Sequence, residues 1–207
     1  AEAPKKIATF TPQKFANTVW AYATAGVEAP ALFEAVAAEA TTKIAKFNPQ
    51  ALASIVWAFA KAGVAAPALF EAVAEEATKK ISIFGPQELA NTAWAFATAG
   101  VEAPALYKAI AAEAPKKMAT FNPQALANTV WAYATAGVEA PALFKAIAAE
   151  APKKIATFDP QNLANTVWAY ATLGVEAPAL FEAVAAEAPM KIATFTPKNL
   201  ANTVWAY

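Results

Sequence analysis

One segment recurs through this sequence at a constant interval of 37 residues. Its clearest copy begins at Asn122, ends at Gly137 and reads NPQALANTVWAYATAG. Tryptophan, phenylalanine and glycine keep the same interval: Trp20, Trp57, Trp94, Trp131, Trp168 and Trp205; Phe10, Phe47, Phe84, Phe121, Phe158 and Phe195; Gly26, Gly63, Gly100, Gly137 and Gly174. A repeat of this length predicts an array in which each unit buries its apolar face against its neighbours.

The interval also determines how the chain divides. Its 207 residues hold about 5.6 units, with full units at 10–46, 47–83, 84–120, 121–157 and 158–194 and partial units at 1–9 and 195–207. No linker or change of composition separates the units, so we predict one domain spanning 1–207. Both ends lack the polar caps of solenoid termini, so we expect a piece of a longer array.

Each unit is predicted to form two antiparallel helices. In the first unit Thr11 suits an N-cap and Pro12 suits the first helical position. Gly26 suits a left-handed C-terminal residue, which places the first helix at 12–25. After a short connection Pro30 begins the second helix. Stacked helix pairs of this kind form an all-α fold, an α-solenoid or superhelix.

The second helix meets a proline in several units. The position after Ala40 is occupied in successive units by Thr41, Thr78, Pro115, Pro152 and Pro189. Because proline removes one backbone hydrogen bond, the helix either kinks or is followed by a new short helix. We predict a kinked extension to about residue 45.

An apolar arc of the first helix is predicted to face the core. In the first unit this arc comprises Phe15, Ala16, Val19, Trp20, Tyr22 and Ala23. The tryptophans are therefore predicted to be buried. On the other side of the helix an alanine recurs in every unit, which predicts a tight helix–helix contact: Ala21, Ala58, Ala95, Ala132, Ala169 and Ala206.

Composition excludes several classes of function. The chain has no Cys and no His, and all 16 basic residues are Lys, so thiolate chemistry and imidazole metal sites are ruled out. No phosphate loop or nucleophile motif is present, so we expect no enzymatic activity, no metal and no cofactor. The 16 lysines balance 16 acidic residues, which leaves no overall positive field. No apolar run approaches the roughly 20 residues needed to insert into a membrane.

The motif Pro-Gln-x-Leu-Ala-Asn-Thr-x-Trp-Ala-Tyr/Phe-Ala-Thr-x-Gly resembles the octotricopeptide repeats and the related heptatricopeptide repeats. The resemblance covers the whole chain, and the unit length lies nearer the heptatricopeptide variant. It implies an α-solenoid that binds single-stranded RNA in a chloroplast or mitochondrion and supports transcript stability, processing, translation or ribosome assembly. Two alternatives stay open: a protein–protein scaffold in a large assembly such as a ribosome, and a consensus-designed sequence with no natural ligand.

Polar side chains near the start of each first helix are candidates for RNA binding. Helical-repeat proteins can read one base per repeat through side chains at fixed positions. The asparagine row comprises Asn17, Ser54, Asn91, Asn128, Asn165 and Asn202. The glutamine row comprises Gln13, Gln50, Gln87, Gln124, Gln161 and Lys198. Between them lies a variable position, the best suited to discriminate bases: Lys14, Ala51, Glu88, Ala125, Asn162 and Asn199. These amides could instead hydrogen-bond one another or the backbone.

Lysine pairs near the end of the second helix are candidates for phosphate contacts. They are Lys5 and Lys6, Lys79 and Lys80, Lys116 and Lys117, and Lys153 and Lys154. Along one edge they would track the phosphates of an RNA strand. Alternatively, they complement the helix macrodipole and lie over neighbouring Phe and Ile side chains. Protein partners in a larger complex are the alternative to RNA.

Overall fold

A computed structural model describes residues 6–207 of the chain. Over that range it contains α-helices and short 3-10 helices and no strand. The chain forms two compact units, of which the first extends to Ile110 and the second runs from Ala111 to Tyr207. Each unit is built from the same helix pair, repeated.

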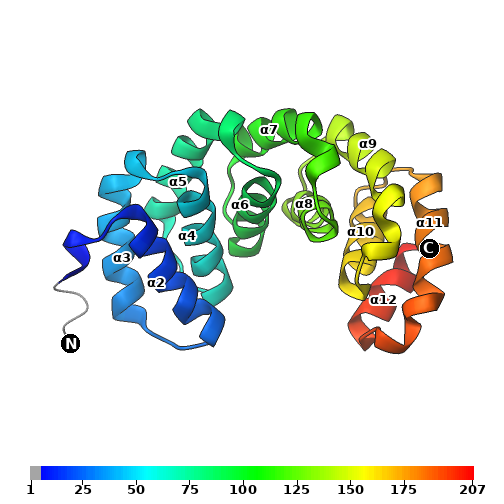
Figure 1. The fold of residues 1–207 in the computed structure, drawn as a ribbon, viewed down its shortest axis with the longest axis horizontal. Helices are drawn as coiled ribbons and strands as arrows, with labels where there is room; N and C mark the ends of the chain where they lie inside the picture. The colour runs from blue at the N-terminus through cyan, green and yellow to red at the C-terminus, as the bar shows by residue number, and fades with distance from the viewer. Residues whose placement is uncertain (1–5) are drawn as a thin grey trace. The chain divides into compact units, whose positions relative to one another are not determined.

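The first helices of the repeats, here called A helices, are α2 (Pro12–Ala25), α4 (Pro49–Ala62), α6 (Pro86–Ala99), α8 (Pro123–Ala136), α10 (Pro160–Thr172) and α12 (Pro197–Ala206). The second, or B, helices are α3 (Pro30–Lys43), α5 (Pro67–Lys80), α7 (Pro104–Glu113), α9 (Pro141–Glu150) and α11 (Pro178–Lys191). Within each unit, A helices pack side by side and B helices cover them, as α2 and α4 do with α3 and α5 (Figure 1). The predicted all-α repeat solenoid is confirmed.

The predicted ends of the A helices are confirmed, because they depend on local interactions. At the start of α4, for example, Asn48 Oδ1 accepts a hydrogen bond from the backbone N–H of Ala51 at 2.8 Å. At the end of α2, Gly26 has a φ of 65°, in the left-handed region that glycine adopts without strain. The N–H of Val27 then donates to the carbonyl of Tyr22 at 3.1 Å, which reverses the chain toward α3.

The ends of the B helices differ from the predicted kinked extension. With Thr41 or Thr78, the α-helix runs to Lys43 or Lys80 and is followed by the 3-10 helices η2 (Ile44–Lys46) and η3 (Ile81–Ile83). With Pro115 and Pro152, the α-helix ends at Glu113 or Glu150, and the longer 3-10 helices η4 (Ala114–Thr120) and η5 (Ala151–Thr157) take over. Only α11 continues through its proline, Pro189, before η6 (Ile192–Thr194). A 3-10 turn accommodates the missing proline N–H here more often than a bent α-helix.

Aromatic pairs join consecutive repeats. Phe33 of α3 meets Phe59 of α4 edge to face, with ring centroids 4.9 Å apart. The same pairing joins Phe70 to Phe96, Phe144 to Tyr170 and Phe181 to Tyr207. Burying one repeat's ring against the next repeat is what couples neighbouring repeats in an array.

The recurring alanine makes the close helix contact that was predicted. Ala58, Ala95, Ala132 and Ala169 are fully buried, whereas Ala21 of α2 is exposed. In α4, α6 and α10 this position therefore faces the A helix of the preceding repeat. A methyl group there allows neighbouring A helices to approach closely.

Candidate functional site

One stripe of each A helix remains open to solvent. On α2 it comprises Gln13, Asn17, Trp20 and Thr24, which lie at i, i+4, i+7 and i+11 and so follow one side of the helix. On the inner A helices such as α4, most of the other positions are buried. We call this stripe, with its copies on the other A helices, the A-helix face.

The tryptophans lie on the A-helix face, so the prediction that they are core residues is wrong. Trp20 is 48% exposed and Trp205 61% exposed, and the four between them are half-buried. The aromatic residue two positions later, such as Phe59 in α4, fills the core instead. The signal in the sequence was that the other positions of the stripe carry polar residues, which indicates that this side of the helix is exposed to solvent.

In the N-terminal unit the indoles form a continuous row. The ring centroids of Trp20 and Trp57 lie 6.4 Å apart, and those of Trp57 and Trp94 lie 6.0 Å apart. Their planes are inclined by 32° and 33°. Holding a base between two rings requires parallel planes about 7 Å apart, twice the stacking rise of a nucleic acid. The row therefore has no space for a base between its rings, and only its exposed side is accessible.

The asparagine and glutamine rows both lie on the A-helix face. Gln13 Nε2 donates to Asn17 Oδ1 at 2.8 Å, an amide–amide bond within α2. Ser54 and the asparagines from Asn91 onward are half-buried, while the glutamines from Gln50 onward are exposed. Each repeat thus presents an amide or hydroxyl beside its indole.

The variable position points between neighbouring A helices rather than outward. Ala51, Ala125 and Asn162 are buried there, Glu88 and Asn199 are half-buried, and Lys14 on α2 is exposed. Most of these side chains are therefore covered by a neighbouring repeat. Glu88 differs from the buried members of this set, because it lines a small polar notch between α4 and α6.

In two of the pairs the second lysine, Lys80 or Lys154, is half-buried and held by backbone carbonyls. Lys80 Nζ donates to the carbonyls of Ala45 and Phe47 at 2.8 Å each and pairs with Glu76 at 2.7 Å. Lys154 makes the equivalent bonds to Ala119 and Phe121, each 2.7 Å. Lys191 makes the equivalent bonds to Ala156 and Phe158, and Lys43 donates to the carbonyl of Ala8, although neither lysine was among the predicted sites. These four ammonium groups tie one repeat to the 3-10 segment that ends the preceding repeat within the same unit.

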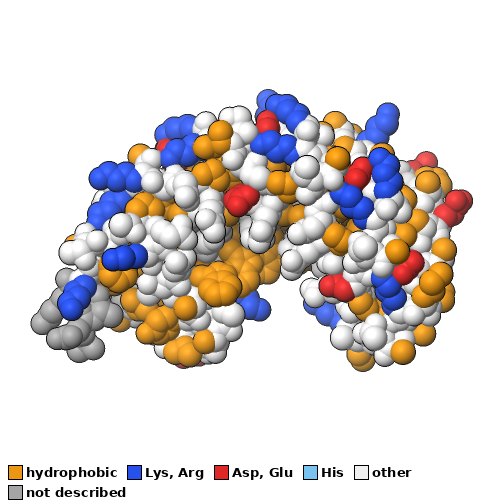
Figure 2. All heavy atoms as spheres, in the orientation of Figure 1, with side chains coloured by type: hydrophobic (Ala, Val, Ile, Leu, Met, Phe, Trp, Pro, Cys, Tyr) orange, Lys and Arg blue, Asp and Glu red, His pale blue; other side chains and the backbone are white. Residues whose placement is uncertain are grey.

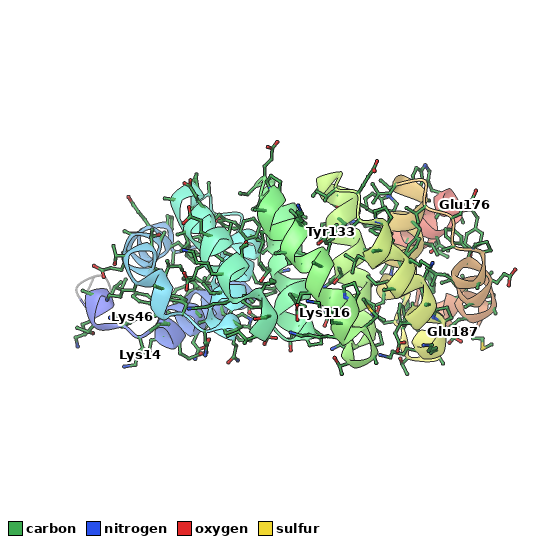
Figure 3. The ribbon with its side chains drawn as sticks, turned by 90° about the horizontal axis from the view of Figure 1, so that it is seen from above. Lys14, Lys46, Lys116, Tyr133, Glu176 and Glu187 are labelled. Atoms are coloured by element: carbon green, nitrogen blue, oxygen red, sulfur yellow. The ribbon has the colours of Figure 1, made fainter. Side chains whose placement is uncertain are left out.

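The first lysine of each pair remains on the surface. The side chains of Lys79, Lys116 and Lys153 are each 66% exposed and reach back one turn to Glu76, Glu113 and Glu150. Lys6 is exposed, and Lys5 lies outside the described residues. In the C-terminal unit Lys116 lies toward one edge and Glu176, in a connection between A and B helices, toward the other (Figure 3).

We call the exposed first lysines of the pairs, Lys79, Lys116 and Lys153, the lysine edge. Ion pairs with glutamates offset much of its positive charge. The hydrogen bond from Lys80 holds the pKa of Glu76 below its ordinary value. The bonds from Lys116 and Lys153 do the same for Glu113 and Glu150, against the opposing effect of burial on each carboxyl pKa. All three carboxylates are therefore charged at neutral pH and offset the lysines.

The two sides of the N-terminal unit differ in chemistry. Hydrophobic side chains gather over α4 and α6, and lysines lie on the side of α3 and α5 (Figure 2). Between residues 6 and 207, no His, Cys, Asp and Glu side chains group in a way that could hold a metal ion. Among the same residues, no helix has the length and apolar character needed to cross a membrane.

The repeats of this chain match a known protein family. The family model of the RNA-editing substrate-binding complex 6 protein matches residues 4–207. The chain belongs to this family. A search of curated proteins found no significant match. The RNA-editing substrate-binding complex 6 family match extends over all of the A helices, so the A-helix face and the lysine edge both lie within it.

Proposed function

We propose that this chain is a non-enzymatic RNA-binding subunit of an RNA-editing substrate-binding complex, with repeats of the octotricopeptide or heptatricopeptide type. Single-stranded RNA lies along the A-helix face. The observation that carries this proposal is the half-exposed indole beside an amide, presented once per repeat. The resemblance supports a role in a mitochondrion or chloroplast.

The row of indoles suits the flat face of an RNA base, and the row of amides suits its polar edge. Exposed aromatic rings stack on the face of any base, which is worth about 1–3 kcal/mol per base. Amides bind the polar edges of bases, as in other one-base-per-repeat proteins. Because the indole and amide of each repeat are neighbours on one helix, both can contact the same nucleotide.

Phosphate contacts come from the exposed lysines at the edge where B helices end. Lys46 lies three residues before Pro49, the first residue of α4. It is therefore near the N-terminal end of α4, as Gln50 is. Figure 3 shows Lys14 and Lys46 near one edge of the N-terminal unit. Because the first lysines of the pairs also contact glutamates, we expect a shallow dependence of RNA affinity on salt.

Binding of single-stranded RNA oligonucleotides by the full chain, at two salt concentrations, tests the proposal. We expect Trp57→Ala to weaken binding roughly tenfold, since it removes one stacking platform. The matched control is Ile83→Ala, which removes an exposed apolar side chain outside the A-helix face. Loss of binding in both variants, or no RNA binding at low salt, would contradict the proposal.

A protein-binding scaffold is the second candidate, and one observation favours it. On the described A-helix face, only Lys61 and Lys198 carry charge. A largely uncharged face with a row of indoles is also suited to a protein segment. An absence of RNA binding, together with assembly of the chain into a multi-protein complex that depends on Trp57, would support this second function.

A further inference from the structure

Three departures from the repeat meet at one place in the N-terminal unit. Ser54 replaces the asparagine that occupies the asparagine row in the other repeats. Glu88 is the one carboxylate at the variable position, and Gly85 replaces the Thr, Asn or Asp that precedes the proline of the other A helices. Ser54 lies on α4, whereas Gly85 and Glu88 lie at the start of α6.

Two of the departures, Ser54 and Glu88, line a polar notch between α4 and α6. Its lining comprises Gln50, Ala53, Ser54, Gln87, Glu88 and Asn91. Serine is shorter than asparagine, so the α4 wall is set back where the other repeats carry an amide. On the α6 side the half-buried Glu88 supplies a carboxylate. The notch is therefore open, polar and acidic on one wall.

Gly85 explains how the carboxylate is held there. A Cβ atom on residue 85 would lie 2.6 Å from Glu88 Oε2, so glycine lets the carboxylate lie this close to the start of α6, whereas a larger residue would require the Glu88 side chain to shift. Accordingly, α6 starts without a side-chain capping bond, while Asn48 caps α4. The positive end of the helix dipole favours the anion at this position.

We propose that this notch is a subsite for the Watson–Crick edge of a guanine base, an inference that rests on the proposed RNA-binding function. An ionised carboxylate only accepts hydrogen bonds, and it can accept two at once. Guanine presents two adjacent donors, N1–H and the N2 amino group. Adenine and cytosine place an acceptor beside their amino group, and uracil flanks its one N–H with two carbonyls. The carboxylate of Glu88 repels those acceptors and binds both donors of guanine.

The surroundings of the notch complete the subsite. Gln50 and Gln87 carry amide donors suited to the guanine O6 atom. Trp57 follows Ser54 by three residues, so the two side chains are neighbours on one side of α4. A base whose edge enters the notch can therefore rest its ring on the indole row.

The test measures binding of fluorescent 12-nucleotide oligouridines, each with one central guanosine, adenosine, cytidine, inosine or uridine. A single guanosine suffices, because the strand can shift until that base reaches the notch. We expect the guanosine strand to bind about tenfold more tightly than the all-uridine strand. Inosine, which lacks the N2 amino group, should fall between them.

The matched variant is the double substitution Ser54→Asn with Glu88→Ala. It restores the residues that α8 carries at these positions, Ala125 and Asn128, so the fold has a working precedent in the same chain. We expect the variant to lose the guanosine preference and to bind all the strands equally. Circular dichroism before and after substitution checks that helix content is unchanged.

Other outcomes separate the two levels of the proposal. Equal binding of all strands by the unsubstituted chain, or a guanosine preference that survives the double substitution, overturns the guanine subsite and leaves RNA binding standing. No binding of any strand at low salt overturns both. Binding of an oligolysine peptide that is lost with Glu88→Ala, without guanosine preference, assigns the notch to a protein partner instead.

Discussion

The phenolic hydroxyl of Tyr170 in α10 donates a 2.6 Å hydrogen bond to the carbonyl oxygen of Phe144 in α9. The two rings also pack edge to face, with centroids 4.9 Å apart. Burial raises the pKa of Tyr170 well above its ordinary value. Since α9 and α10 belong to consecutive repeats, one side chain contributes both packing and a polar bond to the boundary between repeats.

Removing only this hydroxyl should weaken the protein. Tyr170→Phe keeps the ring, as Phe59 and Phe96 do at the same position, but removes a buried hydrogen bond to the Phe144 carbonyl. We expect the free energy of unfolding to fall by about 1–2 kcal/mol in urea titration. Tyr22→Phe, at the same position on the exposed side of α2, is the control and should change little. Equal effects of the two substitutions would contradict this reading.

The two lysines of a pair should differ sharply in their contribution to stability. Lys154 donates to two backbone carbonyls and contacts Glu150, whereas Lys153 is exposed and contacts that glutamate. We expect Lys154→Met to lower the free energy of unfolding by about 2–3 kcal/mol. Lys153→Met should change it by no more than about 0.5 kcal/mol. Chemical denaturation of both variants checks the contrast, which a larger effect of Lys153→Met would refute.

Stability should decline in acid because of the paired glutamates. Their pKa values in the folded chain lie below the ordinary value of 4.5. The unfolded chain therefore takes up protons first as the pH falls, so the stabilisation is present above about pH 4.5 and is lost below it. Melting temperatures measured from pH 7 to pH 3 should be level at first and then fall. Replacing Glu113 and Glu150 by Gln should make the fall less steep, and an unchanged slope would argue against this cause.

The same leucine position should matter in α10 and hardly at all in α12. Leu163 is completely buried, whereas Leu200 is 37% exposed because no further A helix covers that side of α12 in the structure. We expect Leu163→Ala to cost about 3–5 kcal/mol through the cavity it leaves. Leu200→Ala in the same 207-residue chain should cost less than about 1 kcal/mol, measured by urea unfolding. Comparable losses at the two sites would show that burial by the next repeat is not what stabilises this position.

A single array from residue 1 to residue 207 stays a prediction. If neighbouring repeats couple throughout, then tryptophan fluorescence and circular dichroism should report one coincident unfolding transition. Two separated transitions would show that the two compact units unfold independently.

Sequence reasoning succeeded where the decisive interactions are local. Thr11, Pro12 and Gly26 set the ends of α2 through bonds that span a few residues, so the pattern alone predicts them. The shared stripe of Gln13 and Asn17 is equally local, because residues four apart on a helix are neighbours. The proline-dependent change from α to 3-10 geometry at Pro115 depends on how the following segment packs, and the predicted extension was therefore wrong there.

Trp57 and Ser54 mark the limit of that reasoning. Amino-acid order determined the repeat, the helix pair and the polar stripe, since each depends on spacing along one helix. Only the tertiary structure decided which apolar residues are covered, because burial of Phe59 and exposure of Trp57 depend on where neighbouring helices lie. The notch joining Ser54 to Glu88 arises for the same reason: residues 34 positions apart meet only when α4 packs against α6.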